Sequence, residues 1–290
     1  MQFKGTVTAM VTPFGADGGV DFGALRALVE RQVAGGVEGL VPVGTSGESP
    51  TLDRKEHLEV IEKTIEAAAG RAFVVAGTGA NSTAEAVDLT REVIAMGGAA
   101  ATLQVTPYYN KPNPEGLYRH FAAVADLGLP VILYNVPGRA GRDIPLETVV
   151  RLAAHPNVAA IKEAAGSVDR VSAIKNAVPD FTVFSGDDSL ALPMISAGAD
   201  GVISVASNVI PREMSDFIRK ALAGDPAARA EHRRLWPLFR DLFIDTNPIP
   251  VKEALAAMGL LRPGFRLPLC EMDAGKRAKL EATMRSLGLL

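Results

Sequence analysis

Residues 157–167 read NVAAIKEAAGS, and this stretch decides the fold. Positions 158–161 are all apolar, without the alternation of a half-exposed strand, which is typical of a strand buried on both faces of a parallel sheet. The run ends in Lys162 and Glu163. Because an ammonium group is costly to desolvate, a lysine at the inner end of such a strand needs either a partner charge or a chemical use.

Seven other short apolar runs resemble this one. The eight expected strands are residues 6–12, 39–43, 72–76, 101–106, 131–135, 158–162, 182–185 and 201–204. Segments with helical periodicity separate them, and Asp53 with Glu56 three residues later predicts a capping box before the second helix. Eight such units in 220 residues or so favour a closed (β/α)8 TIM barrel of the α/β class. The alternative is a doubly wound open sheet, which more often carries a GxGxxG motif that this sequence lacks.

The last part of the chain has a helical pattern without further strands. The sequence Gly224-Asp225-Pro226 interrupts the chain after the eighth unit. We therefore expect residues 1–224 to form the barrel, which is the catalytic domain, and residues 225–290 to form a C-terminal helical extension packed on it.

The composition narrows the classes of function. The 290 residues carry a net charge of −3, and the Lys and Arg side chains form no basic block, so we expect no nucleic-acid partner. No apolar run reaches the roughly 18–20 residues of a membrane helix, and no secretory signal is visible, so we expect a cytoplasmic protein without a membrane partner. A single cysteine, Cys270, and four histidines without ligand spacing predict no metal site.

The carboxyl ends of the expected strands are where candidate catalytic residues should lie, because TIM barrels place their catalytic groups there. The second strand ends in VGTSGES, where Thr45 and Ser46 lie between glycines and could hold a carboxylate, although a plain strand-to-helix turn is the alternative. Three of the four tyrosines, Tyr108, Tyr109 and Tyr134, lie at the ends of the fourth and fifth strands. Phenols can relay protons at neutral pH, and interface aromatics are the competing interpretation.

Two cationic side chains lie at the ends of the fifth and sixth strands. Arg139 could pair with a substrate carboxylate, although a solvated surface arginine is the default. Burial should lower the pKa of Lys162 and leave a neutral amine that forms Schiff bases with carbonyls, whereas an ion pair with Glu163 or with a neighbouring strand is the alternative. The sequence SGDDS ends the seventh strand, and its Asp187 and Asp188 could hold a metal. Because no histidine or other carboxylate cluster accompanies them, we expect instead that one of them caps the following helix.

Several longer motifs resemble the dihydrodipicolinate synthase family, whose members are also called 4-hydroxy-tetrahydrodipicolinate synthases and belong to the pyruvate-lyase barrels with N-acetylneuraminate lyase. The resemblance covers nearly the whole chain in the order AMVTPF (9–14), VPVGTSGESPTL (41–52), GTGANST (77–83), VTPYYNKP (105–112), YNVPGRAG (134–141), IKEAAG (161–166), FSGDDS (184–189), GVISVASNVIP (201–211) and NPIPVKEAL (247–255).

The resemblance implies a lyase that condenses pyruvate with L-aspartate 4-semialdehyde in the diaminopimelate and lysine pathway, without metal or organic cofactor. Lys162 matches the lysine that forms an imine with pyruvate. Tyr134, Thr45 and Tyr109 match the proton relay. Tyr108 and Tyr109 match a pair at a dimer interface, within an assembly that the family suggests is a homotetramer made of two dimers.

The resemblance also implies the binding residues. Ser46 stands where a threonine usually holds the pyruvate carboxylate, Ile203 matches a residue that lines the pyruvate site, and Gly186 lies beside it. Arg139 matches the arginine that recognises the carboxylate of the semialdehyde. The residues that match an allosteric lysine site are Ser49, His57, Asn81, Glu85 and Tyr108. Arg54 and Pro50 depart from some lysine-sensitive members.

Two other functions compete with this interpretation. A pyruvate-dependent aldolase that cleaves a 2-keto-3-deoxy sugar acid would use the same imine, with different recognition after the fifth strand. A non-catalytic barrel that binds 2-oxo acids should have lost Lys162, Tyr134 or Thr45, and all three are present.

Overall fold

The computed structural model describes residues 3–290, so the first two residues of the predicted catalytic domain lie outside the described residues. Eight strands form a single closed barrel. They are β1 (Gly5–Ala9), β2 (Gly39–Val41), β3 (Phe73–Gly77), β4 (Ala101–Val105), β5 (Val131–Asn135), β6 (Val158–Glu163), β7 (Thr182–Ser185) and β8 (Gly201–Ser204).

All neighbouring strands are parallel and follow one another in chain order, with β8 closing on β1. The predicted TIM barrel is thereby confirmed, and the open sheet is excluded. The first strand is shorter than predicted and ends at Ala9, because its partner strand β2 ends at the opposite residue, Val41. Strand β6 is one residue longer than predicted, because Glu163 still pairs with Asn135 of β5.

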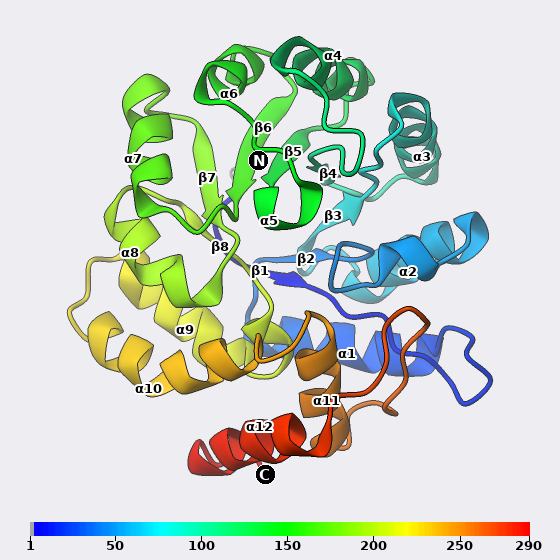
Figure 1. The fold of residues 1–290 in the computed structure, drawn as a ribbon, viewed down its shortest axis with the longest axis vertical. Helices are drawn as coiled ribbons and strands as arrows, with labels where there is room; N and C mark the ends of the chain where they lie inside the picture. The colour runs from blue at the N-terminus through cyan, green and yellow to red at the C-terminus, as the bar shows by residue number, and fades with distance from the viewer. Residues whose placement is uncertain (1–2) are drawn as a thin grey trace.

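Helices surround the barrel, as Figure 1 shows. They are α1 (Phe22–Gly35), α2 (Arg54–Ala68), α3 (Thr83–Met96), α4 (Pro114–Ala125), α5 (Pro137–Ala140), α6 (Leu146–Ala153), α7 (Val168–Ala177), α8 (Ala191–Ser196) and α9 (Pro211–Leu222), with 3-10 turns η1 (Ser49–Thr51), η2 (Asp188–Leu190) and η3 (Ala206–Asn208). The predicted capping box begins α2: Asp53 accepts from the Glu56 amide, and the Glu56 side chain accepts from the Asp53 amide. None of the helices between residues 3 and 290 is long and apolar enough to cross a bilayer.

Apolar side chains form two separate cores. One fills the inside of the barrel and includes Val7, Leu103, Ile132 and Phe184. The other lies between the strands and the surrounding helices and includes Leu133 and Ile161. Because side chains alternate along a strand, each strand contributes to both cores, and this alternation decides which residues face the barrel interior.

Three helices follow the barrel: α10 (Ala228–Asp241), α11 (Ile249–Ala257) and α12 (Ala274–Ser286). In Figure 1 they lie at one side of the ring, below α9 and α1. Lys252 of α11 donates to Glu48 across 2.5 Å, and both side chains are fully buried. This ion pair ties the C-terminal helices to the loop after β2. The boundary between residues 224 and 225 stays a prediction.

Candidate active site

Two adjoining cavities lie where the strands end. The larger, about 310 Å3, is lined by loop residues after β2 and β5, by Tyr108, and by the segments around Asn247 and Pro268. The smaller, about 80 Å3, lies deeper and reaches Lys162. Thr45, Tyr134, Arg139 and Asn247 line both cavities, so the two form one continuous site.

Lys162 and Tyr134 face each other inside the barrel. They are opposite residues of β6 and β5, and the Lys162 ammonium lies 4.2 Å from the centre of the Tyr134 ring. Both side chains are buried. Glu163, the next residue, faces the outer core side and contacts Arg170 across 3.3 Å. The structure therefore excludes the predicted alternative of an ion pair between Lys162 and Glu163.

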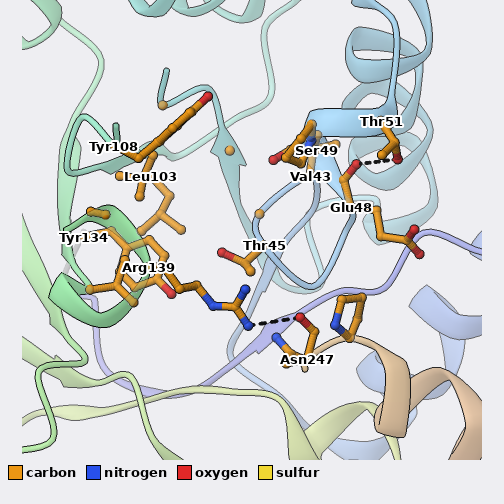
Figure 2. Close-up of a pocket in the computed structure, with 18 of the residues that line it drawn as sticks. Val43, Thr45, Glu48, Ser49, Thr51, Leu103, Tyr108, Tyr134, Arg139 and Asn247 are labelled. Atoms are coloured by element: carbon orange, nitrogen blue, oxygen red, sulfur yellow. Dashed lines mark hydrogen bonds between the residues drawn. The ribbon is translucent and has the colours of Figure 1, made fainter. Parts of the chain in front are cut away.

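The loop after β2 is held in an unusual backbone conformation. Val43 and Glu48 have φ angles of 55° and 54°, which cost about 1–3 kcal/mol each for residues other than glycine. Gly77 of β3 makes the close packing possible, because a Cβ there would meet the Val43 carbonyl at 2.3 Å. Between the strained residues, Thr45 projects into the cavity, and Figure 2 shows it across from Tyr134 and Arg139.

Asn247 joins the two predicted carboxylate-binding residues. The Asn247 side-chain Nδ2 donates to the Ser46 hydroxyl at 3.0 Å. The Asn247 backbone carbonyl accepts from the Arg139 guanidinium at 3.0 Å. The second bond is dashed in Figure 2. The NPIPVKEAL motif begins at Asn247 but does not by itself indicate a role for this residue. The motif was the only signal, since the partners of Asn247 are 108 and 201 residues away along the chain.

The two tyrosines after β4 lie in different places. Tyr108 lines the larger cavity, whereas Tyr109 is absent from both linings and is 89% exposed. The backbone of Tyr109 lies in the left-handed region, with a φ of 73°. Within one chain, Tyr109 is therefore not brought to Lys162.

Of Gly186 and Ile203, only Gly186 lines the cavity that reaches Lys162. Gly186 lines the deeper cavity, and a Cβ there would meet the Ala164 Cβ at 2.5 Å, so a side chain would crowd the floor of the site. Ile203 belongs to the core inside the barrel together with Tyr134, but it is not among the residues that line either cavity.

The predicted helix cap after β7 is wrong. Asp187 precedes the turn without a capping hydrogen bond, and it lines the deeper cavity with Lys162. Burial raises the pKa of Asp187, and the charge of Lys162 opposes the rise. Asp188 accepts instead from the amides of Val205 and Ala206, at 3.1 and 2.8 Å, after β8. A rule based on neighbouring residues cannot see partners 17 and 18 positions away.

The residues expected to bind lysine gather beside the larger cavity. His57 contacts the Gly77 carbonyl at 2.7 Å through Nε2, and burial lowers its pKa. Asn81 donates to the carbonyl of Tyr108 at 3.3 Å. Ser49 lines the cavity itself, and Glu85 raises the pKa of Tyr108, an effect second to that of burial. Over the described part of the chain, no group of three or more His, Cys, Asp or Glu side chains could hold a metal ion.

Comparisons with known proteins agree with this geometry. The model of the dihydrodipicolinate synthetase family matches residues 2–287. A 4-hydroxy-tetrahydrodipicolinate synthase of Hydrogenobaculum sp. (strain Y04AAS1) is 49% identical over the full length of both chains. The solved synthase of Methylacidiphilum fumariolicum SolV superimposes with a TM-score of 0.97 at 49% identity, covering 100% of this chain and 97% of that one. The synthase of Cyanidioschyzon merolae with lysine bound gives 0.96 at 41%, covering 99% of both.

Proposed function

The chain belongs to the dihydrodipicolinate synthetase family and is an enzyme with 4-hydroxy-tetrahydrodipicolinate synthase activity, and from this premise we propose which of its residues carry the reaction. The observation that carries the proposal is the pairing of Lys162 with Tyr134 at the floor of the site. A buried amine next to a phenol has both the nucleophile and the proton donor that imine formation requires.

Lys162 is the nucleophile in this proposal. Its neutral Nζ attacks the pyruvate C2 carbonyl, a proton reaches the resulting alkoxide, and water leaves as the imine forms. The imine then loses a methyl proton to become an enamine, whose carbon bonds to the aldehyde carbon of the semialdehyde. The semialdehyde's amino group finally displaces Lys162 from C2, which closes the ring and frees the enzyme. Tyr134 and Thr45 move the protons, because both line the deeper cavity beside Lys162.

Two carboxylates must be recognised, and the site has a separate donor for each. Ser46, with Gly186 and Ile203 nearby, serves the pyruvate end at the cavity floor. Arg139 serves the semialdehyde end, because it lies where the two cavities meet and its guanidinium has donors left beyond the one that Asn247 uses.

The active form in this proposal is a homotetramer built from two dimers and located in the cytoplasm. Tyr109 supports the dimer, because it is an 89% exposed aromatic residue that lines neither cavity of its own chain. In a dimer, this ring would complete the proton relay of the neighbouring chain.

L-lysine is the proposed feedback inhibitor, bound by Ser49, His57, Asn81, Glu85 and Tyr108. Arg54, the unusual residue near this site, forms an ion pair with Glu92. Because its charge is paired there, Arg54 need not repel the ammonium group of L-lysine, which supports the proposal. Initial rates with and without L-lysine test it, and unchanged rates at saturating lysine would refute it.

The first experiment addresses Lys162. With pyruvate and borohydride, the wild type should gain one reduced pyruvate adduct by intact mass, and Lys162→Ala should gain none, because the nucleophile is gone. Lys63→Ala is the matched control, since Lys63 is an exposed residue of α2 paired with Glu66. An equal adduct on Lys162→Ala would overturn the assignment. Turnover with a sugar aldehyde in place of the semialdehyde would favour the aldolase alternative.

A further inference from the structure

A buried polar network lies directly behind the two central residues of the site. Asn135 follows Tyr134 on β5, and Glu163 follows Lys162 on β6. Because side chains alternate along strands, Tyr134 and Lys162 face the barrel interior while Asn135 and Glu163 face outward. The latter two are opposite residues in the sheet register and are completely buried.

Both side chains are fully engaged in hydrogen bonds. Asn135 Nδ2 donates to both carboxylate oxygens of Glu163, at 2.9 and 3.0 Å, and to Asp143 at 2.7 Å. Glu163 also accepts from the Ala165 amide at 2.9 Å and from Arg170 at 3.3 Å. These bonds cross from β5 to β6 and to the turn after β6, so they fix the ends of both strands.

The same network holds the loop that carries Arg139. Asn135 Oδ1 accepts from the Ile144 amide at 3.0 Å, at the far end of the loop that starts after β5. Arg170 donates to the Ile144 carbonyl and, at 3.4 Å, to Asp143. Both ends of the loop are thus anchored to one buried pair.

Stability alone is a weak reason for this arrangement. Burial raises the pKa of Glu163, and the bonds from Asn135 and Ala165 only partly oppose that effect. Well-packed apolar residues often stabilise a buried position as well as a charged group does. A directional network is better suited to fixing position than to adding stability.

We propose that the Asn135–Glu163 pair positions Tyr134 and Lys162 for imine formation and holds the Arg139 loop in place beside them. The pair touches no substrate and acts through the backbone of its neighbours. Three bonds show how closely that backbone is held: the Tyr134 carbonyl accepts from Thr106 N and Oγ1, both at 2.9 Å, and the Glu163 carbonyl accepts from Gly186 N at 2.8 Å. The inference rests on the proposed role of Lys162.

The test replaces each member of the pair. Glu163→Gln keeps the shape but sets an amide NH2 against N–H donors, and Asn135→Ala removes the bridge between the strands. Misplacing a reacting group by about 1 Å can cost about 100-fold in rate. We therefore expect kcat and the rate of borohydride-trapped adduct formation to fall by about 100-fold in either variant, with a much smaller change in KM for pyruvate.

Ile161→Val is the matched control, because Ile161 faces outward from the same strand, lines neither cavity and has no polar side-chain atom to join the network's hydrogen bonds. It should lower the melting temperature and leave both rates near those of the wild type. The double variant should lose less rate than the product of the two single losses, because one network is broken twice.

Three outcomes are distinguishable. Slow rates in a folded Asn135→Ala variant support the proposal even if Glu163→Gln fails to fold. Rates within twofold of the control, in variants that melt no lower than the control, would overturn it. A wild type that forms no adduct would refute the proposed role of Lys162 instead.

Discussion

Two buried lysines show how the surroundings of a residue decide its use. Lys252 lies 2.5 Å from the Glu48 carboxylate, so its charge is paired, although burial still lowers its pKa. Lys162 is buried too, but among residues 3–290 no carboxylate oxygen lies within ion-pair distance of its ammonium. The Tyr134 ring lies 4.2 Å from its ammonium, and Asp187 lines the same cavity. An amine without a carboxylate partner in a small cavity suits nucleophilic chemistry, whereas a paired amine holds structure together.

Arg139 is where substrate choice can be tested at the scale of one residue. We expect Arg139→Ala to keep the pyruvate adduct and to lower kcat/KM for the semialdehyde by about 10- to 100-fold, the effect of losing a charge-assisted hydrogen bond. Steady-state kinetics with each substrate varied in turn measures this. Arg142→Ala makes the same charge change on the same loop outside the cavity lining and should leave the kinetics unchanged. Equal kinetics for both variants would make Arg139 a bystander.

At the scale of elements, Asp188 links the turn after β7 to the turn after β8 and titrates in an unusual range. Burial raises its pKa to about 6, against the hydrogen bonds that its carboxylate accepts. The folded-state pKa of Asp188 lies above the unfolded-state pKa. The contribution of Asp188 to the unfolding free energy is therefore fully present below about pH 4 and is lost as the pH rises through 6. Relative to Asp188→Asn, the wild type should therefore become less stable between pH 4 and 7, by up to about 3 kcal/mol.

Urea unfolding of both proteins at several pH values measures that difference. The other titrating groups are common to the two chains, so most of their contributions cancel when the unfolding free energies are subtracted. A difference that stays constant from pH 4 to 7 would mean that the folded-state pKa of Asp188 is not raised.

Local patterns predicted the elements well and their contacts poorly. Continuous apolar runs marked all eight strands, because a strand covered on both faces has few polar residues to hide its pattern. The capping box of α2 was also predictable, since Asp53 and Glu56 are near neighbours. Asp188 was misread, because its amide partners belong to the next strand-end loop.

At the scale of the whole molecule, the site depends on contacts between distant segments. Asn247 bonds both Ser46 and Arg139, and the Glu48–Lys252 pair fastens the C-terminal helices to the β2 loop. Nothing in the local sequence around position 247 predicts those partners. The barrel rule indicated which residues stand at strand ends, and the family resemblance supplied their roles, but only the folded chain reveals that the C-terminal segment completes the site.

Whether Tyr109 acts in the neighbouring chain depends on how two whole molecules assemble. If it does, Tyr109→Ala and Lys162→Ala should each be nearly inactive alone yet restore activity when their subunits are mixed. In a mixed dimer, the Lys162→Ala chain supplies an intact Tyr109 to the one site that retains Lys162. Random exchange should then recover about one quarter of the wild-type activity, because half the dimers are mixed and each has one complete site.

Steady-state rates before and after unfolding and refolding of the mixture measure the recovery, and sedimentation analysis shows whether dimers form. Trp236→Ala replaces Tyr109→Ala in the control series. This variant lacks another exposed aromatic side chain, from α10. It should be active on its own, and mixing it with Lys162→Ala should only dilute that activity. If Tyr109 instead served its own chain, no mixture of the two inactive variants could contain a complete site. Their activity would then stay at the level of the separate proteins, however completely the subunits exchanged.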